Sequence, residues 1–175
     1  HNEIENLEGF LYPETYLFSV HSMEKEIIKQ MLIQYHAVVD QVMDGSHAHN
    51  LSNYEIIILA SIIQGEARAI DEMGMISSVF HNRLRDKIPL EANATIQYII
   101  PGKNRRLWEK DLEIDSPYNT YINFGLPPTP INNPGIDAIK AALNPEMTNY
   151  YFFVANPESP GRHIFNEDLT GHLRA

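Results

Sequence analysis

The sequence predicts an α+β fold in a single domain, in which helices pack around one central helix beside a small antiparallel sheet. Residues 51–68, LSNYEIIILASIIQGEAR, form a strongly apolar segment that begins with a helix-capping pattern. Residues 150–155 and 163–166, YYFFVA and HIFN, are predicted to be two strands joined by the turn PESPGR. The 175 residues are enough for one domain with its own core and too few for two domains that each have a sizeable core.

Ahead of the central helix, the sequence predicts an extended segment and one scaffold helix. Residues 7–19 are aromatic and apolar with Pro13 among them, which suits an extended or turn segment packed on the core. Ser22 is a candidate N-cap for a helix over residues 23–43. The polar stretch HAHN at 47–50 is interpreted as a loop, because its two histidines have no third metal ligand at a useful spacing.

The central helix has a clear start. Ser52 followed three residues later by Glu55 forms a capping box, so the helix is predicted to begin at Asn53. Apolar side chains then recur at the spacing of a buried helical face: Ile56, Leu59, Ala60 and Ile63.

The same helix ends on a carboxylate. At about 100° per residue, Glu66 lies within roughly 20° of Leu59 and so continues the buried face, whereas Gln64 is predicted to face outward. A carboxylate on an apolar face is costly to ionise, which raises its pKa and suits it to general acid catalysis. Glu66 is therefore the first catalytic candidate. The alternative is a solvated glutamate beyond the last turn, because Gly65 weakens the helix just before it.

After the central helix, the pattern alternates between helical and irregular segments. Residues 73–85 predict an amphipathic helix that packs against the central one. Residues 89–100, PLEANATIQYII, have a strand-like end rich in β-branched and aromatic residues. Residues 101–135 are rich in proline and glycine without a period, and the stiff motifs SPYNTY at 116–121 and GLPPTPI at 125–131 favour a functional loop.

The last part of the chain contains two more predicted helices. Asn133 and Pro134 suit the N-cap and first position of a short, Ala-rich helix, which Asn144 and Pro145 end. After the two strands, Asn166 is a candidate cap for a final helix.

Composition excludes several classes of function. The formal net charge of -10 argues against a nucleic-acid partner, because phosphate neutralisation needs clustered Lys and Arg, and the basic cluster KNRR at 103–106 is interpreted as a solvated loop. The chain has no cysteine and therefore no thiol nucleophile, thiolate metal site or disulfide. No run approaches the ~18–20 apolar residues of a membrane span. Because the chain opens on the polar HNEIEN without Met, we expect a fragment whose targeting segment lies elsewhere.

Common catalytic motifs do not occur, and the remaining polar groups suit sugars. The sequence has no H-E-x-x-H, G-x-S-x-G, P-loop or G-x-G-x-x-G. What remains is Glu66, a histidine-bearing strand and a proline-stiffened loop with Tyr118, Asn119 and Tyr121. Aromatic planes with amides and hydroxyls are typical of a sugar-binding groove, so carbohydrate chemistry is the leading class.

A series of sequence blocks runs along nearly the whole chain. The blocks are EGFLYPETY at 8–16, ASIIQGEA at 60–67, FHNRL at 80–84, NATIQY at 93–98, SPYNTY at 116–121, GLPPTPI at 125–131, NPG at 133–135, YFFVA at 151–155 and HIFN at 163–166. The most specific combination is SPYNTY followed by GLPP and NPG. In these blocks the chain resembles the catalytic domain of the YceG-like endolytic murein transglycosylases. The resemblance implies that residues 1–175 form one catalytic domain.

The resemblance also implies a reaction. Family members cut peptidoglycan glycan strands internally between N-acetylmuramic acid and N-acetylglucosamine and leave a 1,6-anhydromuramoyl end. Their catalytic glutamate falls at the position of Glu66, which would protonate the leaving oxygen and then take the proton of the sugar's own 6-hydroxyl. Neither a metal nor a cofactor is expected. The implied location is the bacterial cell envelope, outside the cytoplasmic membrane and tethered to it by a segment that, like the cell-wall-binding module, is not in this chain.

Further site candidates lie in the family blocks and are expected to grip the sugars or orient Glu66. Tyr118 is equally suited to core packing, and His163 to a satisfied strand histidine. Arg83 could bind a peptide-stem carboxylate, although a structural ion pair is the commoner reason for such an arginine. Asn93 stands where family members generally carry an aspartate. The candidates are Asn93, Thr95, Gln97, Tyr118, Asn119, Tyr121 and His163.

Two other classes of function stay open. A non-catalytic glycan-binding module, which Asn93 would permit, predicts strand binding without new anhydro ends. A docking domain for a cell-wall synthase predicts that mutation of Pro127 or Tyr121 abolishes partner binding, while Glu66→Gln changes nothing.

Overall fold

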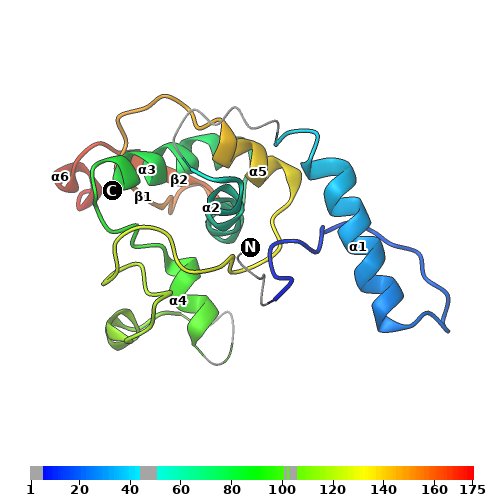
Figure 1. Cartoon of the computed structure of the whole chain (residues 1–175). Coiled ribbons are helices and arrows are strands. Elements are labelled where there is room, and N and C mark those ends of the chain that lie inside the picture. The colour runs from blue at the N-terminus through cyan, green and yellow to red at the C-terminus, as the bar shows by residue number, and fades with distance from the viewer. Residues whose placement is uncertain (1–5, 44–50, 101, 103–105) are drawn as a thin grey trace.

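A computed structural model describes residues 6–43, 51–100, 102 and 106–175 of the chain. The predicted loop at 47–50 and residues 103–105 of the basic cluster lie outside these ranges. Helices surround a central helix, and a two-stranded antiparallel sheet lies near the C-terminus (Figure 1). The elements are α1 (Glu24–Val39), α2 (Asn53–Glu66), the 3-10 turn η1 (Ile70–Glu72), α3 (Met73–Arg85), α4 (Asn93–Ile99), the 3-10 turn η2 (Glu109–Glu113), α5 (Ile136–Leu143), β1 (Phe152–Ala155), β2 (His163–Asn166) and α6 (Leu169–His172).

Helix α2 is the core of the molecule. Ser52 caps it as predicted, because its hydroxyl accepts from the Glu55 N–H at 3.3 Å while the Glu55 carboxylate accepts from the Ser52 N–H at 2.8 Å. Every residue from Ile56 to Ile63 is buried, so the helix is covered on all sides. In Figure 1, α3 and α5 lie above α2 and α4 lies below it.

The predicted outward position of Gln64 is wrong. Gln64 is partly buried, and its Oε1 accepts from the Gly135 N–H at 3.0 Å, at the start of α5. Helix α5 covers this side of α2, so helical position alone could not identify a solvent face.

Helix α1 is shorter than the predicted 23–43. It begins after Met23, rather than after Ser22, because the Glu26 side chain accepts from the Met23 N–H at 3.0 Å. Its buried residues are Tyr35 and Val39, near its C-terminal end. The rest of the helix extends away from the body of the molecule (Figure 1).

The strand-like character of residues 89–100 does not correspond to a strand, because residues 93–99 form α4. The preference of β-branched residues for strands depends on context. Here Thr95 and Ile96 are fully buried, and the Thr95 hydroxyl bonds to the Ala92 carbonyl within the first turn at 2.8 Å. Burial in a helix against α2 therefore overrides the local preference.

The C-terminal part follows the prediction with two shifts. Strands β1 and β2 pair antiparallel, with Phe152 opposite Asn166 and Ala155 opposite His163. Helix α5 begins after Gly135, because the Asn133 side chain instead accepts from the Gly9 and Leu11 N–H groups.

The last helix is also capped differently. Asp168, not Asn166, caps α6, and its carboxylate accepts from the Gly171 N–H at 2.7 Å. Among the described residues, no helix is long and apolar enough to cross a membrane.

Candidate active site

Glu66 lies in a cleft of about 1210 Å³. The cleft is bounded by the end of α2, helix α4, the C-terminal half of α3, the β-hairpin and α6. Its walls thus come from segments that are distant in the sequence. The last residue of α2 is the point where the central helix reaches this cleft.

The carboxylate of Glu66 is partly enclosed and accepts a backbone hydrogen bond. The Ala94 N–H donates to its Oε1 at 2.7 Å. Burial raises the pKa of Glu66, while the Ala94 N–H and the charge of His163 act in the opposite direction. The sequence predicted a carboxylate on the buried face with a raised pKa, and the direction of the pKa shift agrees with that prediction.

Gly65 explains how the backbone of α4 comes so close to Glu66. A Cβ at this position would lie 2.7 Å from the Cβ of Ala94, which is shorter than real contacts allow. Gly65 does not end the helix before Glu66, because Glu66 is the last residue of α2. Its small size lets α4 pack against α2.

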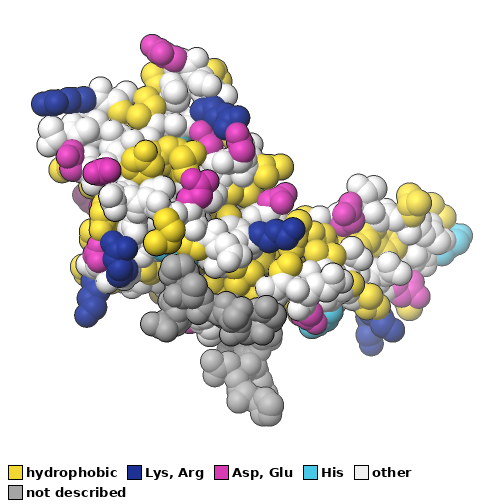
Figure 2. Space-filling model, turned by 90° about the horizontal axis from the view of Figure 1, so that it is seen from above, with side chains coloured by type: hydrophobic (Ala, Val, Ile, Leu, Met, Phe, Trp, Pro, Cys, Tyr) yellow, Lys and Arg dark blue, Asp and Glu magenta, His cyan; other side chains and the backbone are white. Residues whose placement is uncertain are grey.

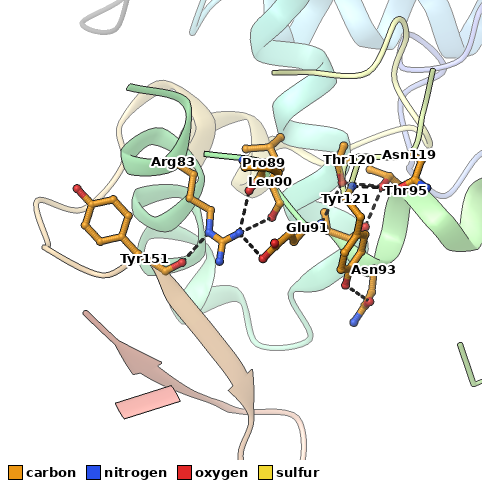
Figure 3. A network of polar contacts seen from close by, with 11 residues as sticks. Arg83, Pro89, Leu90, Glu91, Asn93, Thr95, Asn119, Thr120, Tyr121 and Tyr151 are labelled. Carbon is orange, nitrogen blue, oxygen red and sulfur yellow. Dashed lines mark hydrogen bonds and ion pairs between the residues drawn. The ribbon is translucent and has the colours of Figure 1, made fainter. Parts of the chain in front are cut away.

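A polar network holds the segment that leads into α4 (Figure 3). The Thr120 carbonyl accepts from the Glu91 N–H at 3.0 Å, and its hydroxyl accepts from the Ala92 N–H at 3.0 Å. The Thr95 hydroxyl lies 2.9 Å from that of Thr120. Ala94 lies between Ala92 and Thr95, both of which this network holds, so the network positions the N–H that binds Glu66.

Asn119 holds the backbone next to Thr120 through its side-chain amide. Its side-chain amide donates to the carbonyls of Leu112 and Ile114 at 2.9 Å, and its Oδ1 accepts from the Tyr121 N–H at 2.9 Å. Asn119 and Thr95 are both fully buried. The structure therefore places these two candidates in the scaffold behind the cleft and not in its lining.

Arg83 joins three parts of the cleft wall (Figure 3). It donates to the Tyr151 carbonyl at 2.7 Å and the Pro89 carbonyl at 2.8 Å, and its guanidinium pairs with the Glu91 carboxylate at 2.8 Å. Its guanidinium also lies 4.9 Å from the centre of the Phe152 ring. Glu91 has a left-handed backbone with a φ of 51°, which these bonds stabilise. The structural ion pair is thus present at Arg83.

Four of the seven predicted binding residues line the cleft: Asn93, Gln97, Tyr121 and His163. The Tyr121 hydroxyl donates to the Asn93 Oδ1 at 2.7 Å. Burial, followed by the negative charges of Glu66 and Glu91, raises the pKa of Tyr121 to about 12, so the hydroxyl stays protonated at neutral pH. Tyr121 and Asn93 therefore present paired polar groups beside Glu66.

Tyr118 packs outside the cleft lining. Its ring lies 5.0 Å from that of Tyr98, and its hydroxyl lies 2.8 Å from that of Thr129. This position fits the core-packing alternative of the sequence prediction.

Sequence reasoning missed Glu72 and the Ala94 N–H. Glu72 is 4% exposed and lies 2.9 Å from the His163 Nδ1, although the two residues are 91 positions apart. No spacing rule links positions so distant. The Ala94 donor belongs to the backbone, so its side chain gives no indication of it.

Within the described ranges, no group of three His, Cys, Asp or Glu side chains is arranged to hold a metal ion. His47 and His49, the two histidines of the polar stretch at 47–50, lie outside those ranges. Among the described residues, acidic and basic side chains are interspersed on the face in Figure 2, with no continuous basic patch.

Comparisons with known proteins identify related sequences and a related structure. A family model described as the YceG-like family matches residues 1–175. The chain is 40% identical over 170 residues to the endolytic murein transglycosylase of Bacillus subtilis (strain 168), a match that covers 97% of this chain and 47% of the relative. It is 34% identical over 155 residues to the protein of the same name from Streptococcus pneumoniae serotype 2, which covers 86% of this chain and 28% of the relative.

A solved structure has the same fold. The crystal structure of a YceG-like protein from Listeria monocytogenes matches with a TM-score of 0.89 and 36% identity, over 99% of this chain and 57% of that chain. This chain therefore spans about half the length of the Bacillus relative and less than a third of the Streptococcus one. Because the family model covers every residue and the fold agrees, the chain belongs to the YceG-like family.

Proposed function

We propose that this chain is the catalytic domain of an endolytic peptidoglycan lytic transglycosylase and that Glu66 is its acid and base. The observation that carries the proposal is the Glu66 carboxyl, which lies in the cleft with a raised pKa and one backbone donor. A general acid at neutral pH needs such a raised pKa. The names of the Bacillus and Streptococcus relatives support the reaction class.

The reaction needs one carboxyl group that acts twice. Protonated Glu66 gives its proton to the glycosidic oxygen between N-acetylmuramic acid and N-acetylglucosamine, and the bond from that oxygen to C1 breaks. The 6-hydroxyl oxygen of the same muramic acid bonds to C1 and gives its proton to Glu66. Products are a free 4-hydroxyl and a 1,6-anhydro end, and no water is consumed. The Ala94 N–H stabilises the Glu66 carboxylate between the two proton transfers.

Among the described residues that line the cleft, the other carboxylate besides Glu66 already forms an ion pair. Glycosidases commonly use two carboxyl groups, of which the second acts as base or nucleophile. Glu91 also lines the cleft, but Arg83 holds it in an ion pair at 2.8 Å. At position 93 the chain has the neutral amide Asn93. An internal hydroxyl as nucleophile removes the need for a second free carboxylate.

The size and lining of the cleft suit a polymer. Drug-sized ligands occupy pockets of about 300–1,000 Å³, whereas this cleft measures about 1210 Å³. Tyr98, Tyr121 and Phe152 supply aromatic surface, while Asn93 and Gln97 supply amides. Such a lining supports binding of several sugars on both sides of the cut bond.

Its substrate defines where the protein acts. Peptidoglycan lies outside the cytoplasmic membrane, so the proposed site of action is extracytoplasmic. Tethering to the membrane and contact with a peptidoglycan synthase stay predictions. Pro127 is buried and Tyr121 lines the cleft, so neither presents a simple docking surface for a synthase.

Mass spectrometry of purified glycan strands tests the proposal. Strands incubated with the chain should yield internal fragments that are one water lighter than hydrolysed ends, and Glu66→Gln should abolish them. Ordinary reducing ends would mean a hydrolase with a second group that activates water. Strand binding without cleavage would favour the non-catalytic binding module.

A further inference from the structure

Glu72 is a buried carboxylate that the proposed reaction does not use. It is the last residue of η1 and is 4% exposed. A buried carboxylate is costly unless charged or hydrogen-bonding partners compensate it. Both of its partners, Arg162 and His163, come from the β-hairpin that forms one wall of the cleft.

The two carboxylate oxygens of Glu72 contact different groups. Oε1 accepts from the backbone N–H of His163 at 3.2 Å and lies 3.8 Å from the Arg162 guanidinium. Oε2 lies 2.9 Å from the His163 Nδ1. When Glu72 is ionised, its carboxylate only accepts hydrogen bonds, so the hydrogen of this contact is carried by Nδ1. In the neutral form of the ring, the lone pair then lies on Nε2.

Aromatic neighbours hold the His163 ring in this orientation. The ring of Phe153 meets it edge-on with centroids 5.3 Å apart, and the ring of Phe165 lies 6.2 Å away. The Nδ1 edge faces the buried Glu72, and His163 lines the cleft that contains Glu66. Nε2 has no hydrogen-bond partner among the described residues.

We propose that Glu72 is a positioning residue that sets the tautomer of His163, so that Nε2 accepts a hydrogen bond from a hydroxyl group of a glycan bound beside Glu66. The proposal rests on the proposed function only in taking a glycan strand as the ligand. His163 would contact the substrate, whereas Glu72 would act through His163.

Glu72→Gln gives a sharp test, because an amide has only one oxygen. If that oxygen accepts the His163 backbone N–H, the NH₂ group faces Nδ1 and donates to it. The hydrogen then moves to Nε2, which becomes a donor, and the proposed acceptor is lost. Nitrogen-15 NMR of the imidazole distinguishes the two tautomers directly.

Binding is measured in the Glu66→Gln background with peptide-free glycan strands, so that no cleavage intervenes. We expect Glu72→Gln to invert the tautomer and to weaken strand binding by about tenfold, the size of one lost hydrogen bond in a site that still buries the partner. His163→Ala should weaken binding at least as much. His163→Gln, whose amide oxygen can replace the Nε2 acceptor, should bind within about threefold of the parent.

A second histidine–carboxylate pair provides a matched control. His36 Nδ1 lies 3.1 Å from the Asp40 carboxylate on the exposed surface of α1, outside the cleft lining. Asp40→Asn should leave strand binding unchanged.

The possible outcomes separate this proposal from the proposed reaction. Unchanged affinity after a demonstrated tautomer inversion, an unchanged tautomer in Glu72→Gln, or full binding by His163→Ala would each overturn it. If Glu72→Gln does not fold, His163→Ala and His163→Gln still decide the role of the ring. A Glu66→Gln parent that binds no strands would also overturn the inference. The variants could lose strand binding while the wild-type chain yields no anhydro products. That result would reject the proposed transglycosylase reaction but still support a contact between His163 and the glycan.

Discussion

Glu66 is buried enough for its pKa to rise and is still accessible to a ligand in the cleft. It lies at the end of an apolar helix, so burial raises its pKa, and it opens into a cleft, so a ligand can reach it. The Ala94 N–H stabilises its ionised form without adding a charge of its own. The same residue can therefore give up a proton and take one back.

The pH dependence of kcat/KM reports this carboxyl directly. The acid must be protonated to act, so the rate should fall as the pH rises through the pKa of Glu66. Because burial raises that pKa, the falling limb should lie above about 4.3, the value of an ordinary glutamate. Initial rates on purified strands across the pH range measure it. A limb at the ordinary value would contradict the role of burial.

At the scale of elements, the junction between α2 and α4 decides the site. Helix α4 forms where the local sequence favours a strand, because burial against α2 and the bonds from Thr120 organise it. Gly65 permits the close approach, and the N–H of Ala94 then reaches Glu66. Local propensity predicted a strand where α4 forms, and α4 supplies the N–H that binds Glu66.

Gly65→Ala tests this junction. In an exposed helix, alanine would stabilise by about 0.5–1 kcal/mol over glycine. Here its Cβ would lie 2.7 Å from the Ala94 Cβ and should push α4 away from Glu66. We expect no gain in Tm and a loss of roughly tenfold or more in kcat.

The matched rescue is the double variant Gly65→Ala with Ala94→Gly. Removing the opposing Cβ should restore much of the lost kcat, because the two helices can again approach. Additive losses in this double-mutant cycle would show that the contact between the two residues is not the cause.

At the scale of the whole molecule, the cleft walls are parts of the chain that meet only in the fold. The hairpin, the end of α3 and the segment before α4 converge on Arg83, whose side chain is 6% exposed. One guanidinium therefore fixes the spacing between two sides of the cleft. Helix α1, in contrast, extends away from this region.

Arg83→Lys should lower both stability and activity. Lysine keeps the charge but cannot direct several N–H groups at the Tyr151 and Pro89 carbonyls and the Glu91 carboxylate together. We expect a loss of about 2 kcal/mol in the free energy of unfolding, because buried carbonyls lose their donors. Chemical denaturation measures it.

Arg85 is the control on the same helix. Its pair with Asp86 is largely exposed, with 62% of the Arg85 side chain accessible. Arg85→Lys should change the free energy of unfolding by no more than about 0.5 kcal/mol. Equal losses in the two variants would argue against a special role for Arg83.

The sequence by itself determined the features that depend on neighbouring residues. The capping box of α2, the bounds of α3 and the two strands all follow from local spacing. The predicted fold class is confirmed for the same reason. A candidate acid on a regular helix can be singled out without tertiary structure.

Only the tertiary structure decided which polar residues face the cleft. Thr95 and Asn119 have the polar groups of a sugar-binding residue, yet the scaffold uses those atoms. Thr95 bonds to the Ala92 carbonyl and contacts the Thr120 hydroxyl. The Asn119 amide donates to the Leu112 and Ile114 carbonyls. Glu72 reaches its place beside His163 through a contact across 91 residues. Side-chain type defines what a residue can bind, but the packing of distant segments determines which partner it meets.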